Sequence, residues 1–251
     1  MKGTRCAAAL ALGAAVVLLF ACRSDDAGGT GAMIPDYVYA WGDRLQFVAL
    51  ERAVDPSGEV NVSLLGMDRA EPLRRVLEAP PGDDGCVAIR TESSVDLAPD
   101  AFKDVRSSLA AADFVLVGRA VGRRPGYRGG RLGWIVRVLT EEALRGEPLP
   151  DFLLFFPTGR IDFQGRSYCL FHDAFPSPPE VGDRILLMHQ TQRQGPLIRG
   201  LPSQMVILPA DGPPVVGRRL GQPEPGTEPS ITFSTSAEAL GWARAGAQLA
   251  D

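Results

Sequence analysis

The stretch from Asp113 to Gly118 reads Asp-Phe-Val-Leu-Val-Gly, and it decides the fold of the chain. Its central residues, Phe114 to Val117, are all apolar, which predicts a strand with both faces buried. The segment before it carries apolar residues at helical spacing after a Pro-Asp pair, which predicts a short amphipathic helix over about 100–111. A short helix followed by a buried strand therefore begins the main body of the protein.

Further apolar runs of strand length follow this stretch. They lie at 134–139, 152–156, 185–188 and 204–208. Helical crossovers do not recur between these runs, so five strands after one helix predict a mainly antiparallel sheet. A Gly-rich loop is expected over 123–132, and an irregular stretch over 157–183.

The region before this body is predicted to be a small β-rich segment, 34–80. Its two aromatic and β-branched runs, 37–41 and 45–50, are separated by Gly42-Asp43, which predicts a β-hairpin. A third short strand is expected around 60–65. The Pro- and Gly-rich stretch 80–85 then predicts a boundary.

The end of the chain is predicted to be helical. A Pro- and Gly-rich linker, 217–230, precedes a C-terminal segment, 231–251, in which Thr235 and Glu238 stand at capping-box spacing. A terminal helix is expected to pack Leu240, Ala243 and Ala247 against the body. The fold class expected from these patterns is mainly β with short helices.

The first residues have the layout of a secretory signal. Lys2 and Arg5 precede an uncharged, mostly apolar run, Cys6 to Phe20. As a helix this run extends only about 22 Å, short of the roughly 30 Å hydrocarbon core of a bilayer. The run ends in Leu19-Phe20-Ala21-Cys22, which resembles the lipobox of bacterial lipoproteins.

The lipobox resemblance implies a processed and acylated chain. Residues 1–21 are then a signal peptide, Cys22 carries the acyl chains, and 22–33 is the lipidated cysteine with a flexible Gly-rich tether. Processing removes two of 26 basic residues and none of 30 acidic ones, so the net charge falls from −4 to −6. The acyl chains therefore supply the membrane attachment. The expected location is the cell envelope, on its periplasmic or outer-surface side, and nucleic acid is not an expected partner.

Four cysteines reduce to one pair once Cys6 is cleaved away and Cys22 is acylated. Cys86 and Cys169 lie in a chain expected in an oxidising compartment, which predicts a disulfide that pins the irregular stretch 157–183. A second interpretation is zinc, with Cys169 and His172 in a C-x₂-H pair completed by His189 and Cys86. A third is a Cys169 thiol nucleophile with His172 or His189 as its base.

Several short segments match one known module in order. They are Cys86, Ala112–Val121, Val136–Leu139 with Leu144-Arg145-Gly146, Cys169, and Val181–Leu187. Over 86–216, roughly half of the chain, this order resembles the netrin-like module of tissue inhibitors of metalloproteinases. The resemblance implies a five-stranded OB-like barrel. In those inhibitors an N-terminal cysteine offers its free amine to the protease zinc, whereas Cys86 is internal, so the inhibitory mechanism does not carry over.

The predicted Gly-rich loop is the candidate binding site. It combines four arginines with one tyrosine: Arg123, Arg124, Tyr127, Arg128 and Arg131. In OB-folds the loop between the first two strands often borders the ligand groove, and guanidinium groups with an aromatic face suit an anionic polymer, a glycan or the acidic patch of a partner. A solvated charged hairpin is the alternative interpretation of the same residues.

No motif for catalysis, nucleotide binding or metal binding occurs in the sequence, so catalytic residues, metal and cofactor are all expected to be none. The first hypothesis is a non-enzymatic, lipid-anchored binding module whose partner is a protein or an anionic glycan. A regulator of an extracytoplasmic protease is the second hypothesis. A thiol- or metal-dependent enzyme that uses Cys169 and His172 is the third.

Overall fold

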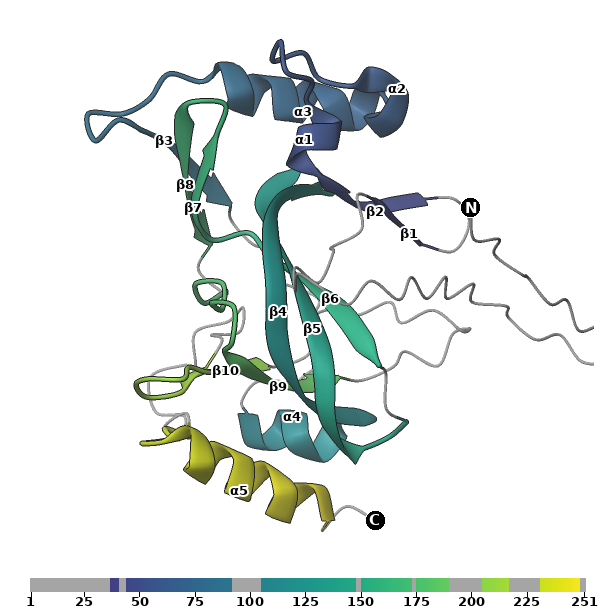
Figure 1. Ribbon diagram of the computed structural model, residues 1–251, viewed down its shortest axis with the longest axis vertical. Coiled ribbons are helices and arrows are strands. Elements are labelled where there is room, and N and C mark those ends of the chain that lie inside the picture. Colours follow the sequence, from purple (N-terminus) through teal and green to yellow (C-terminus); the bar gives the residue numbers. More distant parts are fainter. Residues whose placement is uncertain are drawn as a thin grey trace, which may run out of the picture. The chain divides into compact units, whose positions relative to one another are not determined.

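The computed structural model describes residues 37–40, 44–91, 105–147, 150–172, 175–189, 205–216 and 231–248 (Figure 1). All of them belong to one compact unit. The expected signal peptide, Cys22, the tether and the linker 217–230 lie outside the described residues. Within those residues, no helix has the length and apolar character needed to cross a membrane.

The main sheet has eight strands, and all its pairings are antiparallel. The order is β1-β2-β4-β9-β10-β11, and β5 joins β4 to β6. The strands are β1 Tyr37–Ala40, β2 Arg44–Ala49, β4 Phe114–Arg128, β5 Arg131–Arg145, β6 Asp151–Phe156, β9 Arg184–His189, β10 Met205–Leu208 and β11 Val215–Val216. The mainly β, antiparallel prediction and the N-terminal hairpin are confirmed. Among the described residues no pairing joins β6 to β10 or β11, so the sheet is not closed into a barrel.

The longest feature of the sheet is the β4–β5 hairpin, two strands of 15 residues each (Figure 1). The prediction of a loop over 123–132 is wrong, because β4 continues to Arg128 and β5 begins at Arg131. Only Gly129 and Gly130 form the turn, with φ of 55° and 87°. These positive φ values are those of a tight two-residue hairpin turn, which glycine adopts without strain.

Two of the glycines that suggested a loop instead make room for large side chains. Gly126 and Gly133 lie directly opposite each other on β4 and β5. A Cβ on Gly126 would lie 2.5 Å from Cγ1 of Ile135, and one on Gly133 would lie 2.6 Å from Cζ of Phe155. Ile135 and Phe155 therefore pack over bare backbone, in a small apolar cluster with Phe47.

A second, mixed sheet has three strands, β3 Cys86–Thr91, β7 Gly159–Phe163 and β8 Arg166–His172. β8 lies between the other two, parallel to β3 and antiparallel to β7. The prediction of an irregular stretch over 157–183 is therefore wrong for its first half. β7 and β8 are joined through Gln164 and Gly165, both at positive φ, which again produces a tight hairpin turn.

The segment 34–80 is less β-rich than its sequence suggests. After the β1–β2 hairpin it forms three helices, α1 Leu50–Ala53, α2 Val62–Leu65 and α3 Met67–Glu78. The strand expected around 60–65 is absent from this described stretch, where Val60 makes only an isolated bridge to Val54. The side chain of Asn61 accepts a hydrogen bond from the backbone N–H of Leu64 at 3.1 Å and caps α2, which turns the chain into a helix.

Two of the four apolar clusters pack helices against the sheets. The first packs the three N-terminal helices against the inner face of the β3–β8–β7 sheet, so residues on both sides of 80–85 share it. The second packs α4, Val105–Ala111, and α5, Ser236–Gln248, on the main sheet (Figure 1). Thr235 accepts from the N–H of Glu238, and Leu240, Ala243 and Ala247 are buried, which confirms the predicted cap and packing face.

Candidate functional site

The five arginine and tyrosine residues of the candidate site all lie at the closed end of the β4–β5 hairpin. This end pairs with β2 through two residues, Val48 opposite Tyr127 and Ala49 opposite Gly126. The arginines are therefore strand residues beside the N-terminal segment rather than members of a solvated loop. Their neighbours separate them into two groups, those used inside the fold and those at the turn.

Arg123 is held on both sides. Its guanidinium forms an ion pair with Glu180 at 2.7 Å and lies 4.9 Å from the centre of the Trp134 ring. The carboxylate balances its charge, and the stacking on the indole removes part of its water. Arg123 therefore fastens the chain before β9 to the hairpin.

Arg124 and Tyr127 connect the hairpin to the N-terminal helices. Arg124 pairs with Glu51 of α1, and its side chain is only 19% exposed. The hydroxyl of Tyr127 donates to the backbone oxygen of Arg69 at 2.6 Å. Burial raises the pKa of Tyr127 to about 12, against the opposing effect of the Arg69 charge. Both side chains therefore stabilise the packing of the hairpin against the N-terminal helices.

Arg128 and Arg131 form the second group. They are direct cross-strand partners on either side of the Gly129–Gly130 turn. The guanidinium of Arg128 lies 4.7 Å from the centre of the Phe47 ring. Burial lowers the pKa of Arg128, and the positive charge of Arg131 lowers it further.

No carboxylate in the described part of the chain forms an ion pair with Arg128 or Arg131. Like charges directly opposite each other on two strands destabilise a sheet by about 0.2–1 kcal/mol. The pair therefore costs the folded protein stability with no compensating carboxylate among these residues. The hairpin end presents two adjacent cations that an incoming anion would neutralise.

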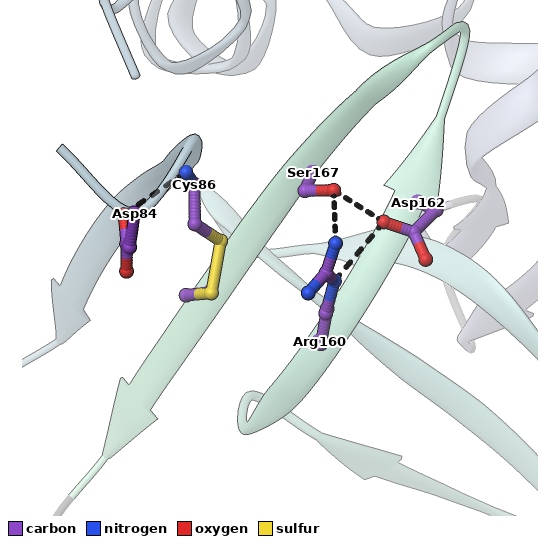
Figure 2. Close-up of a disulfide and its surroundings, with 6 residues drawn as sticks. Asp84, Cys86, Arg160, Asp162 and Ser167 are labelled. Carbon is purple, nitrogen blue, oxygen red and sulfur yellow. Dashed lines mark hydrogen bonds and ion pairs between the residues drawn. A yellow bond between two sulfur atoms is a disulfide. The ribbon is translucent and has the colours of Figure 1, made fainter. Parts of the chain in front are cut away.

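The cysteine pair is joined on the second sheet. Cys86 and Cys169 form a disulfide with their Cα atoms 5.8 Å apart (Figure 2). It links the neighbouring strands β3 and β8, so it pins two strands rather than the irregular loop expected from sequence. The backbone N–H of Cys86 donates to Oδ1 of Asp84 at 3.0 Å. The free cysteine amine of the metalloproteinase inhibitors thus has no counterpart at Cys86.

The surroundings of the disulfide are polar. On β7 and β8, Oδ1 of Asp162 accepts from the hydroxyl of Ser167 at 2.5 Å and from Nε of Arg160 at 3.2 Å (Figure 2). The Ser167 oxygen also accepts from Arg160 at 2.7 Å. The side chains of Arg160, Asp162 and Ser167 thus satisfy one another on an exposed face, and Asp162 consequently has a lowered pKa, mainly through its bond from Ser167.

The geometry separates Cys169 from His172. The two residues are three apart on β8, so their side chains point to opposite faces of the sheet. His172 is buried and packs edge-on against Phe175, with ring centres 4.8 Å apart. In the described residues, no group of three or more His, Cys, Asp or Glu side chains is placed to hold a metal ion. The structure therefore does not bring the zinc set together, and it holds Cys169 and His172 on opposite faces of their sheet.

One contributor to the hairpin end was missed in the sequence. Phe47 was recognised only as part of a strand, yet its ring supports Arg128. The pairing of β2 with β4 creates this contact between distant parts of the chain. The aromatic and β-branched composition of the run 45–50 was the available signal, and it indicates a strand without identifying the neighbouring strand.

Comparisons with known proteins add no relative: no family model, no curated protein and no solved structure matches this chain. The function is therefore inferred from the residues and contacts described above. Among these, the Arg128–Arg131 pair at the hairpin turn has no carboxylate partner in the part of the chain that the structure describes.

Proposed function

We propose that the protein is a non-enzymatic, lipid-anchored binding module of the cell envelope, and that Arg128 and Arg131 contact its anionic partner. One observation carries this proposal. Arg123 and Arg124 are neutralised by Glu180 and Glu51, whereas the pair at the turn has no carboxylate partner among the described residues. A fold that keeps two uncompensated guanidiniums side by side is suited to receive an oxyanion.

The strand order supports an OB-type body for this module. Four of the five pairings that such a barrel uses are present: β4 with β5, β4 with β9, β5 with β6, and β9 with β10. The fifth would join β6 to β10, whose other edge pairs with β11. Phe156 of β6 and Ile207 of β10 nevertheless share one core, as expected of a curled, partly open barrel.

The envelope location is supported by two independent features. The lipobox-like Leu19-Phe20-Ala21-Cys22 follows a signal-type apolar run. The Cys86–Cys169 disulfide is a bond that persists in oxidising compartments. The same bond supports the non-enzymatic part of the proposal, because it consumes the thiol that a nucleophile at Cys169 would need.

The test uses two soluble polyanions as probes, heparin for a sulfated glycan and poly-glutamate for an acidic protein surface. The double variant R128A/R131A is expected to weaken binding of at least one probe about tenfold or more, and to reduce the slope of log affinity against log salt. The melting temperature should stay the same, because the lost stacking on Phe47 is offset by the relieved repulsion.

R74A/R75A is the matched control for this experiment. The two side chains are 38% and 76% exposed on α3, and their replacement removes the same two positive charges elsewhere on the surface. Equal binding by the wild type, the double variant and this control would overturn the assignment of the hairpin end. A double variant that loses binding together with several degrees of melting temperature would also contradict it, because the effect would then be on folding.

A further inference from the structure

We infer that the anion bound by Arg128 and Arg131 is the phosphate of anionic lipid headgroups in the membrane that holds the acylated Cys22. This inference rests on the proposed function and names the partner of the same site. The end of the β4–β5 hairpin then faces the membrane and sets the orientation of the body above it. Three observations lead to this partner: the position of the pair, the length of chain to the anchor, and the distribution of charge.

The arginine pair lies close to the place where the anchored chain enters the sheet. The described structure begins with β1 at Tyr37, β1 pairs with β2, and β2 pairs with the end of β4 that carries Arg128. Arg131 is the next partner in this sequence of strands. Neighbouring strands are about 4.8 Å apart, so Arg128 on β4 lies roughly 10 Å and Arg131 on β5 roughly 15 Å from β1.

The chain between the anchor and β1 is short. Fully extended, the residues from Cys22 to Tyr37 span at most about 50 Å. An acylated Cys22 therefore keeps the hairpin end permanently within reach of the headgroups. Because of this connection, the effective concentration of lipid headgroups at the site is high, and even weak binding is then sufficient. A soluble partner has no such connection and reaches the site only at its concentration in solution.

The charges favour a local contact over general adsorption. Without its signal the chain carries a net charge of −6, so an anionic surface repels the body as a whole. The Arg128–Arg131 pair is a local exception, and each basic residue near an anionic membrane surface is attracted to it. The acyl chains supply the attachment, and the arginines select which end of the body approaches the phosphates.

The experiment is a footprint of arginine reactivity on the complete, processed and acylated protein. It is placed in vesicles of phosphatidylcholine alone, or with about 30% phosphatidylglycerol, and treated with phenylglyoxal. Peptide mapping then gives a modification rate for each arginine. We expect the rates at Arg128 and Arg131 to fall at least about fivefold in the anionic vesicles, while Arg75 changes by less than about twofold.

A single variant tests whether the two arginines act together. In the Arg131→Gln protein, Arg128 should lose most of its protection by anionic vesicles, because one guanidinium remains to hold the phosphate. Undiminished protection of Arg128 in this variant would contradict a paired site. If anionic vesicles protect Arg75 from phenylglyoxal as strongly as Arg128 and Arg131, the vesicles shield the whole protein surface. That result would also overturn the inference.

Further samples separate the lipid from other sources of anion. The same footprint is measured in neutral detergent micelles with inorganic phosphate, heparin or poly-glutamate. Protection by heparin or poly-glutamate without protection by anionic vesicles would overturn the lipid assignment and leave the proposed binding function standing. Protection by inorganic phosphate alone would assign the site to free phosphate and overturn the inference. Protection by none of the probes or vesicles would overturn both.

Discussion

The guanidinium of Arg145 donates to the backbone oxygen of Ala247, 3.3 Å away in the last turn of α5. The same side chain donates to the oxygens of Leu109 at 2.7 Å and Ala112 at 3.0 Å, at the end of α4. The last carbonyls of a helix lack intrahelical partners and carry the negative end of its dipole. One half-buried cation at the end of β5 therefore caps two helices at once.

Arg145→Met should consequently lower the free energy of unfolding by about 2–4 kcal/mol, because several partly buried helix-end carbonyls lose their donor. Arg145→Lys should lower the free energy of unfolding by a smaller amount, because it keeps the positive charge. Some loss remains, because lysine lacks the planar fork that reaches both helices. Urea denaturation measures both free energies. Arg75→Met is the control at an exposed arginine, and its free energy of unfolding should change little. A loss below 0.5 kcal/mol, roughly the smallest net value of one hydrogen bond, would contradict the capping role.

Gly146→Ala should be strongly destabilising. Gly146 has φ +79°, and an added Cβ would lie 2.7 Å from the backbone oxygen of Asp113. The strained φ alone costs about 1–3 kcal/mol, and the backbone contact adds to it. Gly85→Ala is the matched control, because Gly85 has φ +74° with open space around it. In thermal denaturation the melting temperature of Gly146→Ala should lie well below that of Gly85→Ala. An equal loss of melting temperature in the two variants would show that the Asp113 contact relaxes at no cost in stability.

Replacing both Cys86 and Cys169 by serine should lower the free energy of unfolding by about 4–5 kcal/mol in the chain-entropy account, because the bridge closes a loop between residues 83 apart. Guanidinium denaturation of oxidised wild type, reduced wild type and the double variant measures it. The reduced protein and the double variant should agree. If reduction leaves the midpoint unchanged, the bridge does not restrict the unfolded chain as proposed.

Stability should fall at alkaline pH through Tyr127. Its pKa is raised to about 12 in the folded protein, against about 10 in an unfolded chain, so the folded state keeps a proton that the unfolded state releases. The contribution is complete below pH 10 and is lost as the pH rises toward 12. Burial also raises the pKa of Tyr168, so the test compares wild type with Tyr127→Phe.

Tyr127→Phe loses the hydrogen bond to Arg69 and should be about 1 kcal/mol less stable than wild type at pH 7. Between pH 10 and 12 the wild type should lose stability faster, so the difference between the two proteins narrows. Denaturation at a series of pH values measures this difference. A gap that stays constant across this range would show that Tyr127 titrates alike in both states.

The sequence identified most of the secondary structure where the signal is local. The apolar run Phe114–Val117, the cap formed by Thr235 and Glu238, and the first hairpin each follow from the residues within them. It failed where a residue's role depends on a distant neighbour. Gly126 and Gly133 are of the residue type that favours loops, but they lie in paired strands. Glycine fits there because the side chains of Ile135 and Phe155 occupy the space that a Cβ would need.

The candidate site shows the same division. Composition and spacing were enough to single out the arginines between positions 123 and 131. They did not reveal that Arg124 is neutralised by Glu51, a residue 73 positions earlier, while the Arg128–Arg131 pair keeps its charge. Short-range periodicity and turn chemistry depend on neighbouring residues, so the sequence by itself determined the first hairpin, the core of most strands in the main sheet, the terminal helix and the cysteine pair, but not β7 and β8. Charge pairing depends on which strands become neighbours, and only the tertiary structure decided that the hairpin end presents two guanidiniums with no carboxylate partner among the described residues.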